Sequence, residues 1–260
     1  MTDSTSTRRR ITATPDIGLI LTSLFDADLK VQLRNARALV VSLFLPIVVM
    51  FALGAGKRGA LFPASSRLAI AIGLGITSVA ILGYTATVAR DRETGVFQRL
   101  RATPAPTWAI MGSRLAVQVL SIVVMTIVVF IVGAAILKVT LDPGAYALTI
   151  VVAVLGAAEF LSVGQAIVGL LKSADTVNAI GRLLYIPLFG LGIFSNISLF
   201  GSTLETIARW SPGGALLGML AGAMAPATWN SDDWWSVLAS LAYSLVFAAV
   251  GIRWFQWETR

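Results

Sequence analysis

The densest group of charged side chains lies between residues 90 and 106, directly after an apolar stretch. It reads Arg-Asp-Arg-Glu-Thr-Gly-Val-Phe-Gln-Arg-Leu-Arg-Ala-Thr-Pro-Ala-Pro. Glu93 and Phe97 are four residues apart, so a short helix would present them on one face. Phe97 and Leu100 would give that helix an apolar edge, and the two prolines would stop it. A stiff, charged, amphipathic segment of this kind suits docking on a partner protein. Positive charge beside a membrane, followed by a helix end, would explain the arginines but not the rest of the pattern.

A second group of polar side chains lies inside the apolar stretch 145–171. Glu159 is an acid deep within this stretch, and Ser162 and Gln165 follow it, which places polar groups on one side of a helix. An acid at the bilayer centre costs roughly 2.5–3.5 kcal/mol on insertion scales. Two interpretations stay open. The group lines a substrate path or a proton site, or Glu159 is a packing residue, protonated and hydrogen-bonded to a neighbouring helix.

Several kinds of chemistry are excluded by residues that the chain lacks. It has no cysteine and no histidine, which removes disulfides, Cys nucleophiles, Ser-His triads, and zinc or haem held by His. The sequence most similar to the P-loop pattern Gly-x4-Gly-Lys-Ser/Thr is Gly54-Ala55-Gly56-Lys57-Arg58. It fails because Phe51 stands where the first glycine is required and Arg58 where Ser or Thr is required. We therefore expect no catalytic site, metal or cofactor in this chain.

The elements that position these residues follow from composition. Apolar residues make up 57% of the 260 residues and charged residues only 13%, against about 45–50% and 25% in soluble domains. A soluble domain of this size could not bury so much apolar surface. The sequence predicts an all-α membrane protein, because a spanning helix needs about 20 apolar residues and barrel strands would alternate. Six transmembrane helices are predicted, at about 36–53, 68–89, 115–137, 145–171, 183–199 and 234–252.

The basic residues predict the orientation of these spans. If the N-terminus is inside, inner segments hold fifteen of the twenty Lys and Arg residues. Basic residues concentrate on the cytoplasmic side, where they meet anionic lipid. Both termini are therefore expected to be cytoplasmic. The net charge of +7 is explained in this way without a nucleic-acid partner.

Two segments are predicted to lie at or partly within the membrane. Residues 1–35 form a cytoplasmic tail and an amphipathic helix whose apolar side chains recur at helical spacing, as in helices that lie along a membrane surface. A solvated lead-in helix is the alternative. Residues 196–233 are too apolar for an exposed loop, and we expect one or two re-entrant helices entering from the outer side. A helix lying flat on the membrane is the alternative there. The rest of 36–260 is the transmembrane domain.

The 90–106 pattern closely resembles the signature of type-2 ABC-exporter permeases. That family has a Glu-Arg-Glu-x-Gly-x-x-x-x-Leu-x-x-x-Pro segment between its second and third spans. The match here is at Arg92, Glu93, Gly95, Leu100 and Pro104, with an aspartate in place of the first acid. The family's six spans, interfacial helix, inner termini and re-entrant helices resemble the organisation predicted above.

The resemblance implies a permease subunit whose coupling helix contacts a separate ATPase subunit, which would hold ATP and Mg. Two ATPase copies and a second permease, identical or related, are implied partners, with membrane lipid around them. The cargo would be an amphiphilic drug, antibiotic or lipid-like molecule exported across the cell membrane. The segment 172–182 is expected to be an inner loop making a smaller second contact. An ion- or proton-coupled secondary transporter is the alternative. The expected ATPase contacts are Arg90, Asp91, Arg92, Glu93, Gly95, Phe97, Arg99, Leu100 and Pro104.

Overall fold

The computed structural model describes residues 16–34, 36–54, 64–194 and 202–255. Within these ranges all regular elements are helices, which confirms the predicted all-α class. Residues 1–15, 35, 55–63 with Lys57, 195–201 and 256–260 lie outside the described residues. The elements are α1 (Ile17–Arg34), α2 (Ala36–Gly54), α3 (Ala64–Thr77), η2 (Ser78–Tyr84), α4 (Thr85–Glu93), α5 (Val96–Arg101), α6 (Thr107–Val132), η3 (Gly133–Leu137), α7 (Pro143–Leu170), α8 (Ala174–Phe194), α9 (Ser202–Trp210), α10 (Pro212–Met224), η4 (Pro226–Thr228) and α11 (Ser231–Trp254).

Five helices in the described part of the chain are long and apolar enough to cross a membrane. This is the arrangement of an integral membrane protein. The first predicted span corresponds to α2, and the count of six spans remains a prediction. The five helices are Ser65–Glu93, Thr107–Leu137, Pro143–Leu170, Ala174–Ile193 and Ser231–Trp254.

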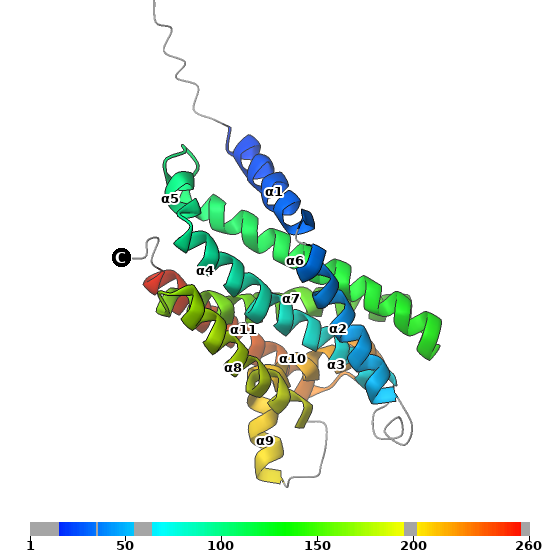
Figure 1. Cartoon of the computed structure of the whole chain (residues 1–260). Helices are drawn as coiled ribbons and strands as arrows, with labels where there is room; N and C mark the ends of the chain where they lie inside the picture. Colours follow the sequence, from blue (N-terminus) through cyan, green and yellow to red (C-terminus); the bar gives the residue numbers. More distant parts are fainter. Residues whose placement is uncertain (1–15, 35, 55–63, 195–201, 256–260) are drawn as a thin grey trace, which may run out of the picture.

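The helix formed by α3, η2 and α4 lies at the centre of the bundle (Figure 1). The most apolar stretch of this helix is 89% buried, whereas that of α11 is 17% buried. Helix α7 packs along α11 more extensively than any other pair of described elements, and α10 packs against α11, α8 and α7. The exposed apolar side chains of α8 and α11 therefore lie on the outer surface of the bundle.

The predicted re-entrant segment contains two short helices, α9 and α10, at the opposite end of the bundle from α5 (Figure 1). The hydroxyl of Ser211 accepts a hydrogen bond from the Gly214 amide at 3.1 Å and caps α10, and Pro212 occupies the first turn. Helix α10 has only 13 residues and is largely buried, whereas a crossing helix needs about 20. The segment is thus helical over α9 and α10, and the re-entrant character of these helices remains a prediction.

The expected inner loop 172–182 is wrong over most of its length. Helix α8 already begins at Ala174. Ser173 provides the local reason, because its hydroxyl accepts a hydrogen bond from the Thr176 amide at 3.1 Å and so satisfies a free donor of the first turn. Asp175 adds a negative charge in the first turn, where the helix dipole favours it. Only a short connection therefore separates α7 from α8.

Candidate functional site

The 90–106 segment comprises the end of α4, the six-residue helix α5 and the connection to α6. Gly95 lies between the two helices with φ of 70°, a left-handed conformation that side chains other than glycine rarely adopt. The Gly95 amide donates to the Arg92 carbonyl at 3.2 Å and closes the end of α4. Glu93 and Phe97 consequently belong to different helices. The expectation that they share one helical face is wrong, because Gly95 redirects the chain between them.

Arg92 is turned into the protein and binds the C-terminal end of α7. Its guanidinium donates to the carbonyls of Val168 at 2.9 Å, Leu171 at 2.7 Å and Lys172 at 2.8 Å. The last carbonyls of a helix have no partner within the helix and carry partial negative charge. A planar guanidinium with several donors can satisfy more than one of them. Arg92 therefore links the end of α4 to the end of α7.

The next residue, Glu93, binds the beginning of α8. Its carboxylate accepts a hydrogen bond from the backbone N–H of Ala174, the first residue of that helix, at 2.6 Å. A negative charge is favourable there, because the first amides of a helix are unpaired and the helix dipole is positive. The adjacent Arg92 and Glu93 thus bind the two helix ends on either side of the α7–α8 connection, each with the charge that its helix end favours.

Two further contacts join the 90–106 segment to α6 and α11. Asp91 forms an ion pair with Arg114 of α6. The Arg114 guanidinium lies 4.6 Å from the ring centroid of Phe97, a cation–π contact. The Phe97 and Phe255 rings are perpendicular to each other, with centroids 6.0 Å apart. The 90–106 segment is therefore in contact with α6 and the end of α11, as well as with the α7–α8 connection.

The expected ATPase contacts fall into three groups in the structure: buried, half-buried and exposed. Arg92 and Phe97 are 2% and 0% exposed, which corrects their expected place on the contact surface: they hold the segment from within. Asp91, Gly95 and Leu100 are half-buried, and Glu93 is exposed although its carboxylate is engaged. The outward face of the segment is formed by Arg90, Gln98, Arg99, Arg101, Thr103 and Pro104.

The polar group predicted in the fourth span is divided among separate partners. Glu159 is fully buried and accepts a hydrogen bond from Ser240 of α11 at 2.8 Å. The hydroxyl of Ser162 donates to the Glu159 backbone carbonyl at 2.6 Å. Gln165 accepts a hydrogen bond from the hydroxyl of Tyr84 in η2. Glu159 thus faces α11 while Gln165 faces the central helix, so the three side chains do not line one shared surface.

Comparison with known proteins identifies the class of protein to which these contacts belong. The profile of the family described as "ABC-2 type transporter" matches residues 21–225. This chain belongs to the ABC-2 type transporter family. It is also 25% identical over 172 residues to a Bacillus subtilis (strain 168) protein described as "Putative transport permease YvfS", over 66% of this chain and 68% of that protein. The chain is therefore an ABC transporter permease, and its family implies an ABC ATPase subunit as partner.

The ABC-2 permease also contains a polar contact that the sequence analysis did not find. Asp28 of α1 accepts a hydrogen bond from the Ser113 hydroxyl of α6 at 2.5 Å. Burial raises the pKa of Asp28, Ser113 and the charge of Arg114 act against that rise, and the charge of Asp91 adds to it. The sequence did contain an indication: Asp28 lies four residues after Leu24 and three before Val31, and so interrupts the apolar stripe of α1.

Proposed function

We propose that this permease is the membrane subunit of an ATP-driven exporter and that its 90–106 segment is the coupling element. The exposed side of α5 would lie against the ATPase subunit. The observation that carries the proposal is the set of contacts from the other side of the segment. Arg92 and Glu93 bind the two ends of the α7–α8 connection, and Asp91 pairs with Arg114 of α6.

The proposed mechanism follows from those contacts. ATP binding closes the ATPase subunits and displaces α5. The end of α4 is fixed by charged hydrogen bonds and α5 by the packing of Phe97, so α6, α7 and α8 move with the 90–106 segment. Such a movement shifts a membrane dimer between inward- and outward-facing arrangements. Two ATPase copies and a second permease, identical or related, complete the complex, and ATP and Mg are bound by the ATPase.

The topology of the proposed complex follows the sequence prediction. Helix α2 is the first of six spans, α1 lies along the inner surface of the membrane, and α9 and α10 enter from the outer side. Both termini lie in the cytoplasm, and the protein resides in the cell membrane. The positions of α5 and α9 at opposite ends of the bundle support this arrangement (Figure 1). The cargo is an amphiphilic small molecule, because the described connections contain no large domain outside the helices.

The buried Glu159 is assigned to packing rather than to a proton or substrate path. Its carboxylate is directly bonded to Ser240 in the most extensively packed helix pair. Substituting Glu159→Gln retains a hydrogen-bonding side chain of similar size. We expect this variant to transport normally at every pH tested, whereas a proton-coupled role requires transport to lose its pH dependence.

Vesicles that contain the permease and its co-purified ATPase subunit test the proposal against secondary transport. A substitution in the ATPase that removes hydrolysis should abolish cargo movement, and collapse of the ion and proton gradients should leave it unchanged. The opposite pair of results would establish the ion- or proton-coupled alternative. The purified permease alone provides the control for passive leakage of the cargo.

A further inference from the structure

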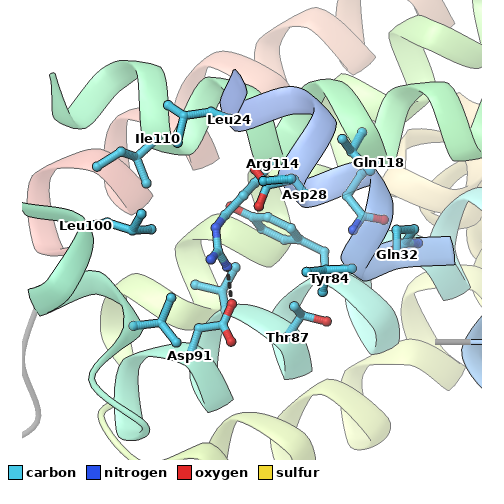
Figure 2. Close-up of a pocket in the computed structure, with 15 residues that line it drawn as sticks. Leu24, Asp28, Gln32, Tyr84, Thr87, Asp91, Leu100, Ile110, Arg114 and Gln118 are labelled. Carbon is cyan, nitrogen blue, oxygen red and sulfur yellow. Dashed lines mark hydrogen bonds and ion pairs between the residues drawn. The ribbon is translucent and has the colours of Figure 1, made fainter. Parts of the chain in front are cut away.

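A partly enclosed cavity of about 280 Å³ lies between α1, α4, α5 and α6. This volume is close to the lower end of small-molecule sites, which span roughly 300–1,000 Å³. The side chains in Figure 2 converge on it from the four helices, and Arg114 extends across it toward Asp91. The cavity adjoins the 90–106 segment, and its occupant would touch both that segment and α1.

Most of the wall is apolar. Leu24 of α1, Val88 of α4, Leu100 of α5 and Ile110 of α6 contribute to it. Val88 and Ile110 are each only 1% exposed, so this part of the wall is firmly held by the surrounding core. Burial of an alkyl chain against such a wall is favourable by about 0.8 kcal/mol per methylene. The wall therefore suits the hydrocarbon part of an amphiphile.

The cavity is lined by more negative than positive side chains. Its lining contains two carboxylates, Asp28 and Asp91, and one guanidinium, Arg114. Arg114 is paired with Asp91 and lies over the Phe97 ring. Asp28 has the Ser113 hydroxyl as a hydrogen-bond donor, at 2.5 Å. A neutral hydroxyl does not compensate a full charge, so the cavity carries about one negative charge in a mostly apolar setting.

We propose that this cavity binds an amphiphile through its ammonium group. The ammonium would pair with Asp28 and donate charge-assisted hydrogen bonds, and the alkyl chain would lie along the apolar wall. An anionic head group would meet two carboxylates, and a neutral one would leave Asp28 and Asp91 to share the single charge of Arg114. The proposal concerns this cavity alone and does not depend on what the permease exports.

Native mass spectrometry of the purified permease, released from detergent, tests the site with decylamine, decanol and decanoate. We expect one saturable decylamine per chain and no saturable binding of the other two. Asp28→Asn should weaken decylamine binding at least tenfold. Asp26→Asn is the matched control on the same helix, because Asp26 is 61% exposed and paired with Lys30, and it should bind as the wild type does. Equal binding by Asp28→Asn, or equal binding of decanol, would overturn the proposal.

A second pair of variants tests the cavity itself without changing its charge. Thr87 lies on the wall; Thr87→Phe should fill the space and abolish decylamine binding, whereas the isosteric Thr87→Val should preserve it. Binding that survives Thr87→Phe would contradict the site. The same experiment shows whether the natural ligand is a membrane lipid or a free amphiphile. One phosphatidylethanolamine retained by the purified protein and displaced by decylamine identifies a lipid, and decylamine binding to lipid-free protein identifies a free amphiphile.

Discussion

The carboxylate of Glu93 accepts a hydrogen bond from the backbone N–H of Ala174 at 2.6 Å. The two residues are 81 positions apart in the sequence, so this bond joins the end of α4 directly to the first turn of α8. Together with the hydrogen bonds of Arg92, this bond fixes the short connection between α7 and α8 to the 90–106 segment.

Substitution of Glu93 tests this bond. Glu93→Ala should cost about 1 kcal/mol of stability, as the loss of a helix cap does, and should uncouple transport while the protein remains inserted. Glu93→Gln keeps an acceptor and should retain most of the coupling. The measurement is ATPase stimulation and cargo efflux in the reconstituted complex. Wild-type values of both in Glu93→Ala would show that the bond does not transmit the movement.

Arg92 should be less tolerant of substitution than its neighbour. Arg92→Met removes the donor from three carbonyls at the end of α7, and a hydrogen bond to a charged group contributes about 1.5–3 kcal/mol. Arg92→Lys keeps the charge but lacks the planar fork, so it should restore only part of the loss. In thermal unfolding in detergent, the wild type should be the most stable, Arg92→Lys intermediate and Arg92→Met the least stable. Equal stability of all three variants would contradict the assigned contacts.

The backbone of Gly95 predicts a graded effect. Its φ of 70° costs an ordinary L-residue about 1–2 kcal/mol, and asparagine tolerates this region better than alanine. Gly95→Ala should therefore lower stability and coupling more than Gly95→Asn. Gly112 lies in α6, where an added Cβ meets nothing within 4 Å, so Gly112→Ala is the control. A Gly95→Ala variant as stable as Gly112→Ala would argue against the left-handed turn.

Asp91 and Arg114 should behave as an energetic unit. Each side chain is largely withdrawn from solvent, with exposures of 23% and 10%, so screening by water is limited. A double-mutant cycle with Asp91→Asn and Arg114→Gln should give a coupling energy of about 1 kcal/mol in thermal unfolding. Additive effects would mean that the pair contributes nothing to holding the 90–106 segment against α6.

Asp28 predicts a pH dependence with a definite sign. Because its pKa in the folded protein lies above the ordinary 3.8, the folded state binds more protons than the unfolded state between those two values. Stability should therefore fall as pH rises through this window and remain lower above it. Asp28→Asn should flatten the change, measured as unfolding temperature against pH. Curves of equal slope for the variant and the wild type would contradict the burial of this carboxyl.

The helices were largely predictable because hydrophobic length and helix-ending residues act locally. In the 90–106 segment the helix end before the two prolines was predicted, whereas the break at Gly95 between α4 and α5 was not. The roles of Arg92 and Phe97 were not predictable in this way. Their partners Val168 and Phe255 are far along the chain, and only the packed bundle brings them together. Arginines next to a membrane span are also common because they set its orientation. The sequence pattern therefore contained no sign that Arg92 points into the protein.

The early start of α8 and the Asp28 contact had local indications of a weaker kind. Ser173 followed by Asp175 resembles a helix start, but the segment lies between two predicted spans and was read as a loop. Asp28 interrupts an apolar stripe, which indicates a partner on the facing helix without identifying Ser113. Sequence pattern thus indicates that a polar residue needs a partner, and tertiary structure determines which residue it is.

The central claim is that the outward side of α5 lies against the ATPase subunit, and one labelling experiment tests it most directly. The chain contains no cysteine, so single cysteines can be introduced at the exposed Gln98 of α5 and at the exposed Gly144 near the start of α7. Maleimide should label both in the free permease. In the complex with its ATPase, Gln98→Cys should become protected while Gly144→Cys stays reactive. Equal labelling of Gln98→Cys in the free and the complexed permease would contradict the account.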